Sequence, residues 1–243
     1  MHNQLLLLSL LLLIPQTSVG QDPTPAEAKQ KLQDQGRDLS RSSYESAIVD
    51  GEDDIVRLYL EAGYPANGTI ETGSIELTYL EMTFGDHPEV TKALLQYGAD
   101  PNKPGVMGSY PIHQAIPHAR SMQLLIENGA KIRATNNLGF KPIHSAIIRD
   151  TTTEVQTRAV RILLNHGADP NSQVGEGDIE GATPLLICAT RGRPSVAQVL
   201  LENGAAPNLD DSPLTLEDGQ TLSDLARSRG NISTAEIIDA YEN

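Results

Sequence analysis

A pattern of apolar residues followed by turn-forming residues recurs along the chain. Each copy closes an apolar helical face with leucines, continues into a glycine and ends in residues such as Ala-Asp-Pro-Asn. Because glycine adopts the left-handed conformation that ends a helix, and proline lacks the N–H that would continue one, the pattern predicts a helix terminator. The five copies are LYLEAGYPAN at 58–67, LLQYGADPN at 94–102, LLIENGAKIR at 124–133, LLNHGADPN at 163–171 and LLENGAAPN at 200–208.

The spacing of these terminators predicts a stack of similar units. Their glycines, Gly63, Gly98, Gly129, Gly167 and Gly204, are separated by 35, 31, 38 and 37 residues in turn. Within a unit the pattern predicts a short helix, a tight turn, a longer helix, the terminator and an extended stretch. Such a unit cannot bury its apolar face alone, so we expect an all-α solenoid of about six stacked units. The expected units span approximately 37–67, 68–102, 103–133, 134–171, 172–208 and 209–243.

A polar segment at 21–36 precedes the first unit. Thr24 and Glu27 have the spacing of a capping box, and Pro25 suits the first helical turn. We therefore expect a short N-terminal capping helix that shields the otherwise exposed apolar end of the stack.

Residues 1–20 have the pattern of an export signal. The apolar run LLLLSLLLLI at 5–14 is too short to span a bilayer, and the small residues Ser18 and Gly20 suit signal peptidase. We expect cleavage after Gly20. Cys188 is the only cysteine of the chain, so no intramolecular disulfide can form. This favours the periplasm of a bacterium over secretion, which is the alternative.

The units resemble the ankyrin repeat. Residues 181–208, GATPLLICATRGRPSVAQVLLENGAAPN, follow its pattern throughout, and YPIHQA at 110–115 and KPIHSA at 141–146 carry its Pro-x-His-x-Ala core. The resemblance covers roughly 37–243. It implies helix-turn-helix repeats with β-hairpin fingers, and a concave groove, lined by the fingers and the first helices, that binds other proteins.

The second and fourth units are among those that depart from the ankyrin pattern. The second unit, with ELTYLEMTFGDHPEV, lacks Pro-x-His. The fourth unit has about five extra residues, which the segment 149–158 has to hold, either by lengthening the second helix or by forming a bulge. In the same unit Leu163 and Leu164 are expected to pack between neighbouring repeats.

Charge and composition restrict the class of partner. The chain carries 18 basic and 32 acidic residues, a formal net charge of −14. This excess of negative charge disfavours nucleic acid and favours a protein with a basic surface or cleft. The aromatic content of 4% without tryptophan suits a core of Leu, Ile, Val and Ala on stacked helices.

No pattern of catalytic or ligand residues stands out. His113 and His144 match the ankyrin histidine that hydrogen-bonds the backbone of a neighbouring repeat, and they lie too far apart to share a metal. Cys188 occupies a position for a small buried residue, where a thiol is usually inert. We therefore expect neither an enzyme nor a bound cofactor or metal.

Function is then expected on the fingers, where the repeats differ. Central fingers offer apolar anchors, and late fingers offer carboxylates without any Lys or Arg among them, which suits steering of a basic partner. Alternatively, Tyr110 and Phe140 pack onto the preceding finger, and the acids form a solvated face. The candidate partner-binding residues are Val106, Met107, Tyr110, Leu138, Phe140, Glu176, Asp178, Glu180, Asp210, Asp211, Glu217 and Asp218.

Three functions are compatible with these features. The first is a periplasmic inhibitor or immunity protein, because the chain resembles exported bacterial ankyrin proteins, some of them encoded beside toxic effectors such as membrane-lipid hydrolases. The second is a periplasmic scaffold or stress-protection factor that supports another enzyme, such as a catalase. The third, an enzyme, is disfavoured. We expect a monomer when unbound, without membrane insertion once the signal is removed.

Overall fold

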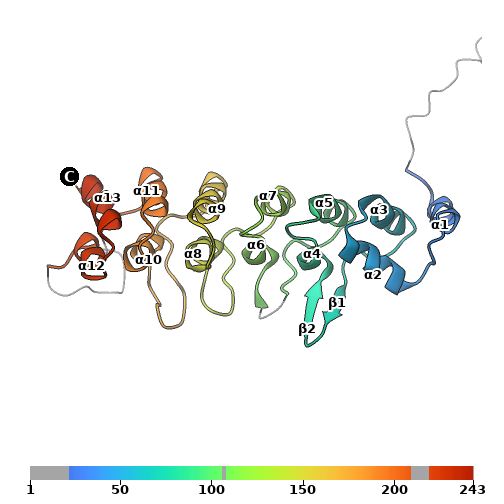
Figure 1. The fold of residues 1–243 in the computed structure, drawn as a ribbon, viewed down its shortest axis with the longest axis horizontal. Coiled ribbons are helices and arrows are strands. Elements are labelled where there is room, and N and C mark those ends of the chain that lie inside the picture. The colour runs from blue at the N-terminus through green and yellow to red at the C-terminus, as the bar shows by residue number, and fades with distance from the viewer. Residues whose placement is uncertain (1–21, 106–107, 209–218, 243) are drawn as a thin grey trace, which may run out of the picture.

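Helix pairs are stacked in two rows along the molecule (Figure 1). The structure is a computed structural model that describes residues 22–105, 108–208 and 219–242. The inner row consists of α2 (Arg41–Asp50), α4 (Tyr79–Met82), α6 (Pro111–Gln114), α8 (Pro142–Ile148), α10 (Pro184–Arg191) and α12 (Leu222–Ser228). The outer row consists of α3 (Asp53–Glu61), α5 (Pro88–Gln96), α7 (Ala119–Glu127), α9 (Thr153–Asn165), α11 (Pro194–Glu202) and α13 (Ile232–Glu242). The arrangement confirms the predicted solenoid.

The first helix, α1 (Pro25–Asp34), covers the N-terminal end of the outer row (Figure 1). Its N-terminus has the expected capping box, in which the Thr24 hydroxyl accepts from the Glu27 N–H and the Glu27 carboxylate accepts from the Thr24 N–H. Ala28 and Leu32 are fully buried where α1 packs against α3. The helix thus shields the apolar side of the first pair, as the sequence predicts.

Each outer helix from α3 to α11 ends at a terminator glycine. The five glycines have φ between 86° and 95°, the left-handed region. A Cβ built on Gly167 would meet no atom within 4 Å, so its backbone conformation rather than lack of space demands glycine there.

Asparagine at the end of the terminator joins one repeat to the next. The Asn171 amide donates to the Gly204 carbonyl and its Oδ1 accepts from the Ala206 N–H, at 3.0 and 2.7 Å. Asn67 and Asn102 form the same pair of bonds with the next terminator. Since both backbone groups belong to a helix end that has no intrahelical partner for them, the amide fixes the position of one terminator on the next.

Two histidines tie the inner row together, as their sequence context predicts. His113 Nε2 lies 3.0 Å from the Phe140 carbonyl oxygen, and His144 Nε2 lies 2.8 Å from that of Ser172. His144 is completely buried, and burial lowers its pKa to about 4. Its Nδ1 accepts from the Lys141 N–H, so the neutral ring donates through Nε2.

The second pair forms without the Pro-x-His motif. Thr78 caps α4, and Glu81 completes a capping box by accepting from the Thr78 N–H at 2.8 Å. Tyrosines fill the space around this end of the stack, since the rings of Tyr44, Tyr59 and Tyr79 are buried and the Tyr44 ring centroid lies 5.3 Å from that of Tyr59 and 5.6 Å from that of Tyr79. Although the chain is poor in aromatics, it concentrates them here.

The extra residues of the fourth unit lengthen its outer helix. α9 has 13 residues, whereas α3, α5, α7 and α11 have 9 each. Gln156 on its inner side is buried and donates to the carbonyls of Ile147 and Arg149, which anchors the segment 149–152. The first of the two sequence-based alternatives is therefore confirmed.

The extended stretches form the fingers, which project beyond the inner row (Figure 1). Within the described residues, only the second unit's finger contains a strand pair, β1 (Thr69–Thr72) and β2 (Ile75–Thr78), which run antiparallel. In the finger of the fourth unit a backbone bond from the Asn136 N–H to the Phe140 carbonyl closes the loop. That of the fifth unit is closed between Val174 and Ala182.

Removing Leu163 is expected to destabilise the stack more than removing Leu164. Leu163 is completely buried, whereas Leu164 is only partly buried against the core, which corrects the expectation that both are enclosed. Leu163→Ala should lower the free energy of unfolding by about 2–5 kcal/mol. Leu164→Ala is the matched control and should cost clearly less in chemical denaturation. Equal losses would contradict this assignment of the buried face.

The burial of His144 predicts a pH dependence of stability. An unfolded histidine has a pKa near its ordinary value of 6.5, and the folded His144 has a pKa of about 4, so the unfolded state binds the proton more strongly. The free energy of unfolding should therefore fall as pH drops from about 6.5 to about 4, by roughly 3 kcal/mol from this residue. Denaturation at several pH values should show a drop smaller by that amount in His144→Gln, in which the carboxylates still titrate. Parallel curves would rule the assignment out.

Candidate functional site

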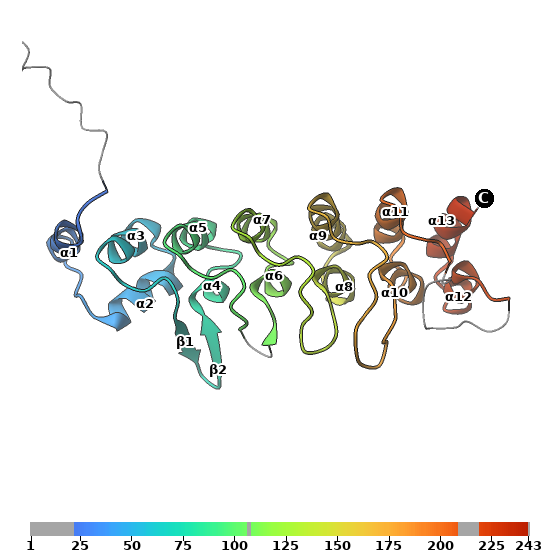
Figure 2. The ribbon, with the colours of Figure 1, turned by 180° about the vertical axis from the view of Figure 1, so that it is seen from behind.

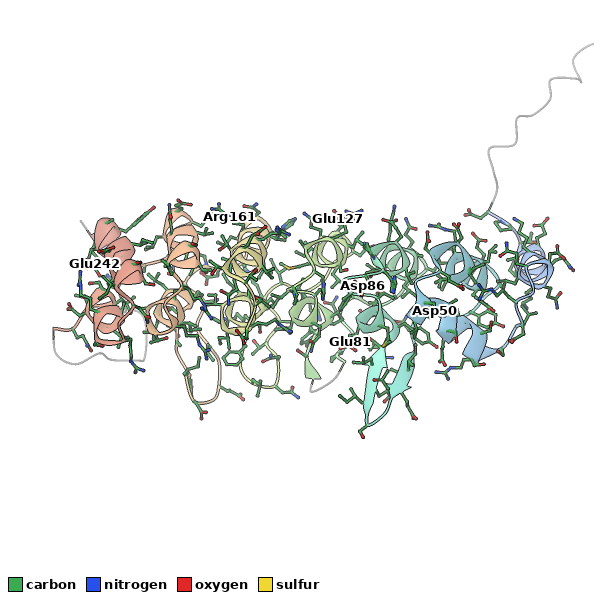
Figure 3. All side chains as sticks on the ribbon, in the orientation of Figure 1. Asp50, Glu81, Asp86, Glu127, Arg161 and Glu242 are labelled. Carbon is green, nitrogen blue, oxygen red and sulfur yellow. The ribbon has the colours of Figure 1, made fainter. Side chains whose placement is uncertain are left out.

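The face formed by the fingers and the inner row is the candidate binding surface. Figure 2 shows the fingers continuing from the inner row on the side away from the outer helices. Among the labelled side chains of Figure 3, Glu81 lies at the base of the β1–β2 finger, whereas Glu127 and Arg161 lie on the outer row. We refer to the surface between fingers and inner helices as the concave face.

The finger of the fifth unit carries exposed carboxylates. Glu176, Asp178 and Glu180 are all exposed, and the loop 171–182 contains no Lys or Arg. Its backbone is held against the preceding finger, because the Gly175 N–H donates to the Gly139 carbonyl at 2.9 Å. The three acids are thus presented from a fixed loop, as a negative field needs if it is to act on an approaching partner.

The apolar candidates of the central fingers differ in exposure. Leu138 is 55% exposed at the tip of its finger. Tyr110 and Phe140 are half-buried against the core, and the Tyr110 ring centroid lies 6.1 Å from that of His113. Leu138 is therefore available as an anchor, whereas part of the surface of each of the two aromatic rings is buried against the core. A role in binding stays a prediction for all three.

The other candidate residues lie outside the described part of the chain. They are Val106, Met107, Asp210, Asp211, Glu217 and Asp218.

Sequence reasoning missed the β1–β2 finger as a binding element. Glu71 and Glu76 are cross-strand partners on one side of the hairpin, and the alternation of a strand places Ile75 and Leu77 on the other. Ile75 is 50% exposed. The alternation in TIET and IELT around the turn residues 73–74 is the signal that could have revealed it.

The apolar side of this finger borders a depression of about 390 Å³ in the concave face. Ile75 and Leu77 line one part of it, and Phe84 and Pro117, which follow α4 and α6, line another. Pockets that hold small ligands or anchoring side chains have volumes from about 300 Å³ upwards. The depression is thus large enough for one or two side chains of a partner.

Arg149 is the cation of this depression, and sequence reasoning missed it as well. It follows α8 and reaches back to α6, where its Nη2 donates to the His113 carbonyl at 3.2 Å and to Gln114 Oε1 at 3.3 Å. The guanidinium is half-buried, and burial lowers its pKa. In the sequence Arg149 falls at the start of an insertion, so no periodicity marks its position.

The described residues contain neither a metal-binding cluster nor an accessible thiol. No group of three or more His, Cys, Asp or Glu side chains among them could hold a metal. Cys188 is completely buried, and burial raises the pKa of its thiol far above neutral pH, so it is no nucleophile. No described helix is long and apolar enough to cross a membrane.

Comparison with known proteins agrees with this architecture. The family profile described as "Ankyrin repeats (3 copies)" matches residues 80–174 and 112–211. An ankyrin repeat protein of Fowlpox virus (strain NVSL) is 28% identical over 155 residues, which are 62% of this chain and 44% of that protein. One of Rickettsia bellii (strain RML369-C) is 28% identical over 131 residues, 53% of this chain and 48% of that protein. The chain thus spans less than half the length of these two relatives.

Solved structures share the fold over most of the chain. The ankyrin repeat domain of human ASB11 has a TM-score of 0.63 at 24% identity, and the match covers 84% of this chain and 85% of the ASB11 chain. An ankyrin repeat domain from Acinetobacter baumannii AYE has a TM-score of 0.64 at 21% identity, with coverages of 84% and 99%. The stacked helix pairs, the terminators and the profile match show that the chain belongs to the ankyrin-repeat family, whose repeats serve as protein–protein interaction modules.

Proposed function

We propose that this chain is an exported, non-enzymatic inhibitor or immunity protein that binds a toxic effector enzyme through the concave face and blocks its active-site cleft. A membrane-lipid hydrolase such as a phospholipase suits the proposal, because a cleft that binds anionic headgroups is basic and complements a chain of net charge −14. The signal-like residues 1–20 support a periplasmic location.

One observation carries the proposal, namely the exposed carboxylates of Glu176, Asp178 and Glu180 beside the half-exposed apolar surface of Leu138. The Gly139 carbonyl bonds the fifth finger to the fourth, so the acids and the leucine have a fixed relation. Charges at a rim accelerate encounter, while desolvated apolar anchors slow dissociation. A rigid surface with both features is suited to occupying a cleft.

A scaffold or stress-protection role would use the same surface but affect the partner differently. Activity of the bound enzyme separates the two functions, because an inhibitor suppresses turnover in proportion to complex formed and a scaffold preserves it. The product of the adjacent gene is the first enzyme to test.

Export predicts a processed chain. Protein from the periplasmic fraction of the native host should have the intact mass of a chain that begins at Gln21, as measured by mass spectrometry. A full-length mass in the cytoplasm would contradict both the cleavage and the location.

Neutralising the acidic finger should slow association. The triple variant Glu176→Gln, Asp178→Asn, Glu180→Gln is expected to lower the association rate with the adjacent-gene product and to flatten its salt dependence, with little change in dissociation. A triple variant of exposed outer-row acids, Asp54→Asn, Glu127→Gln and Glu236→Gln, removes the same charge and should have a much smaller effect. The control residues are Asp54 on α3, Glu127 on α7 and Glu236 on α13. Equal effects would show that only net charge matters.

Truncating the exposed leucine should speed dissociation. Leu138→Ala is expected to raise the dissociation rate about tenfold, since an interface anchor typically contributes 1–2 kcal/mol or more. Ile232→Ala on α13 removes an equally exposed aliphatic side chain, at 51% against 55%, and should leave the rate unchanged. If Ile232→Ala mattered and Leu138→Ala did not, the concave face would not be the binding site.

A further inference from the structure

The guanidinium of Arg149 keeps most of its hydrogen-bonding capacity unused. Both of its bonds to the protein, to the His113 carbonyl and to Gln114 Oε1, are made by Nη2. Within the described residues Nε and Nη1 donate to no acceptor. An arginine carries five N–H groups, two of them on Nη2, so the single N–H of Nε and the two of Nη1 remain available.

The same guanidinium has no acidic partner among the described residues. Glu81 also lines the depression, but its carboxylate caps α4 through Thr78, with Oε2 accepting from the Thr78 N–H and hydroxyl at 2.8 and 2.9 Å. Asp86 is exposed and lies close enough to His118 to oppose in part the lowering of the imidazole pKa that burial causes, yet it forms no ion pair with Arg149. A half-buried positive charge without a counterion has lost hydration that the two bonds of Nη2 replace only in part.

Apolar side chains form part of the lining around this unpaired cation. Ile75, Leu77, Phe84 and Pro117 line the depression together with the polar Glu81, Gln114 and His118, so a group bound there is partly shielded from water. Because ion pairs and hydrogen bonds strengthen where solvent is excluded, a bond between Arg149 and an anionic group in the depression would be stronger than the same bond in water. His118, whose pKa is lowered mainly by burial, is neutral at pH 7 and adds no competing charge.

We propose that this depression is a receptor site for an acidic side chain of the partner protein, an Asp or Glu adjoining a large apolar residue, whose carboxylate is held by the free donors of Arg149. The apolar neighbour then packs against Ile75 and Phe84. The proposal deepens the proposed function, because it rests on partner binding at the concave face and adds the chemistry of one contact.

The site gives the face a specificity that acidic fingers alone lack. A chain of net charge −14 repels acidic segments in general and attracts basic ones. A carboxylate is favourable only where a cation lies unpaired, so a basic partner has to present its acid opposite Arg149 to gain the contact. A partner that places its carboxylate opposite Arg149 gains affinity from the contact. A partner that binds out of register leaves the guanidinium unpaired and binds more weakly.

A random peptide display library selected on the purified full chain tests the site without knowledge of the partner. Enriched peptides should carry Asp or Glu next to an aromatic or large aliphatic residue. The best peptide is then synthesised, together with a copy in which the acid is replaced by its amide, and both are titrated onto the wild-type chain and onto Arg149→Gln, Arg149→Lys and Arg149→Glu.

The amide peptide and Arg149→Gln should each weaken binding by at least about tenfold, because a charge-assisted bond contributes 1.5–3 kcal/mol. The two changes together should weaken it little further, since they remove the same contact. Arg149→Lys should recover only part of the affinity, because lysine keeps the charge without the fork. Arg149→Glu should abolish binding of the acidic peptide.

Arg161→Glu is the matched control. It reverses an exposed arginine of the outer row and should leave peptide affinity unchanged (Figure 3). Circular dichroism melts show whether each Arg149 variant is folded. If Arg149→Gln does not fold, the amide peptide on the wild-type chain still decides, since it alters no residue of the protein.

Peptides enriched without acidic residues, equal affinity of the acid and amide peptides, or additive losses in the double change would each overturn the proposal. So would a selection that enriches no peptide. These results are distinct from failure of the inhibitor proposal. Binding and inhibition of the adjacent-gene product with no effect of Arg149→Gln would leave the inhibitor standing without this site. Selection through Arg149, with no binding to that product, would leave the site with another partner.

Discussion

The packing of each helix pair on the next is the contact on which the whole molecule depends. One pair offers only a narrow apolar face, so leucines such as Leu163 are buried only when the neighbouring pair is in place. Polar ties then set the register. The amide of Asn171 spans the helix end of the next repeat, and His144 reaches the carbonyl of Ser172 in the following finger. Every repeat that keeps these ties is free to vary elsewhere.

Positions that take no part in these ties can vary from repeat to repeat, and they form the surface on the fingers and the inner row. Because the fingers and the exposed side of the inner row carry little of the stacking contact, they hold acids in the fifth unit, an exposed leucine in the fourth and a true strand pair in the second. Arg149 is a positive charge at a specific position on this net acidic chain. A chain with a large negative charge places one half-buried guanidinium within an apolar depression, where its hydrogen-bonding fork has donors to spare. In the proposed function the exposed acids and this cation would act on a partner by different physical means, the acids through long-range attraction and the cation through a direct contact.

The end of the stack shows what happens when a tie is missing. The second unit has no Pro-x-His, and a capping box of Thr78 and Glu81 starts its short inner helix instead. Buried tyrosine rings, among them Tyr44 and Tyr79, occupy the adjoining space, and their hydroxyls bond to the Pro65 carbonyl and the Glu45 carboxylate. Large rings with a polar tip thus replace contacts that elsewhere come from the repeat pattern.

The sequence by itself determined the solenoid, because its causes are local and repeated. Gly167 needs a left-handed conformation, and Thr24 and Glu27 cap a helix. The bond from His144 to the next finger was implied by the resemblance of its Pro-x-His-x-Ala motif to the ankyrin repeat. Counting residues placed the insertion of the fourth unit at 149–158, but it did not decide between a longer helix and a bulge. Only the tertiary structure decided which side chains meet across units. Ile75 and Arg149 are far apart in the chain, and they line a common depression only because the stacking brings the β1–β2 finger near the C-terminal ends of α6 and α8. The sequence left exposure undecided as well, since Phe140 is half-buried against the core whereas Leu138, two residues away on the same finger, is exposed.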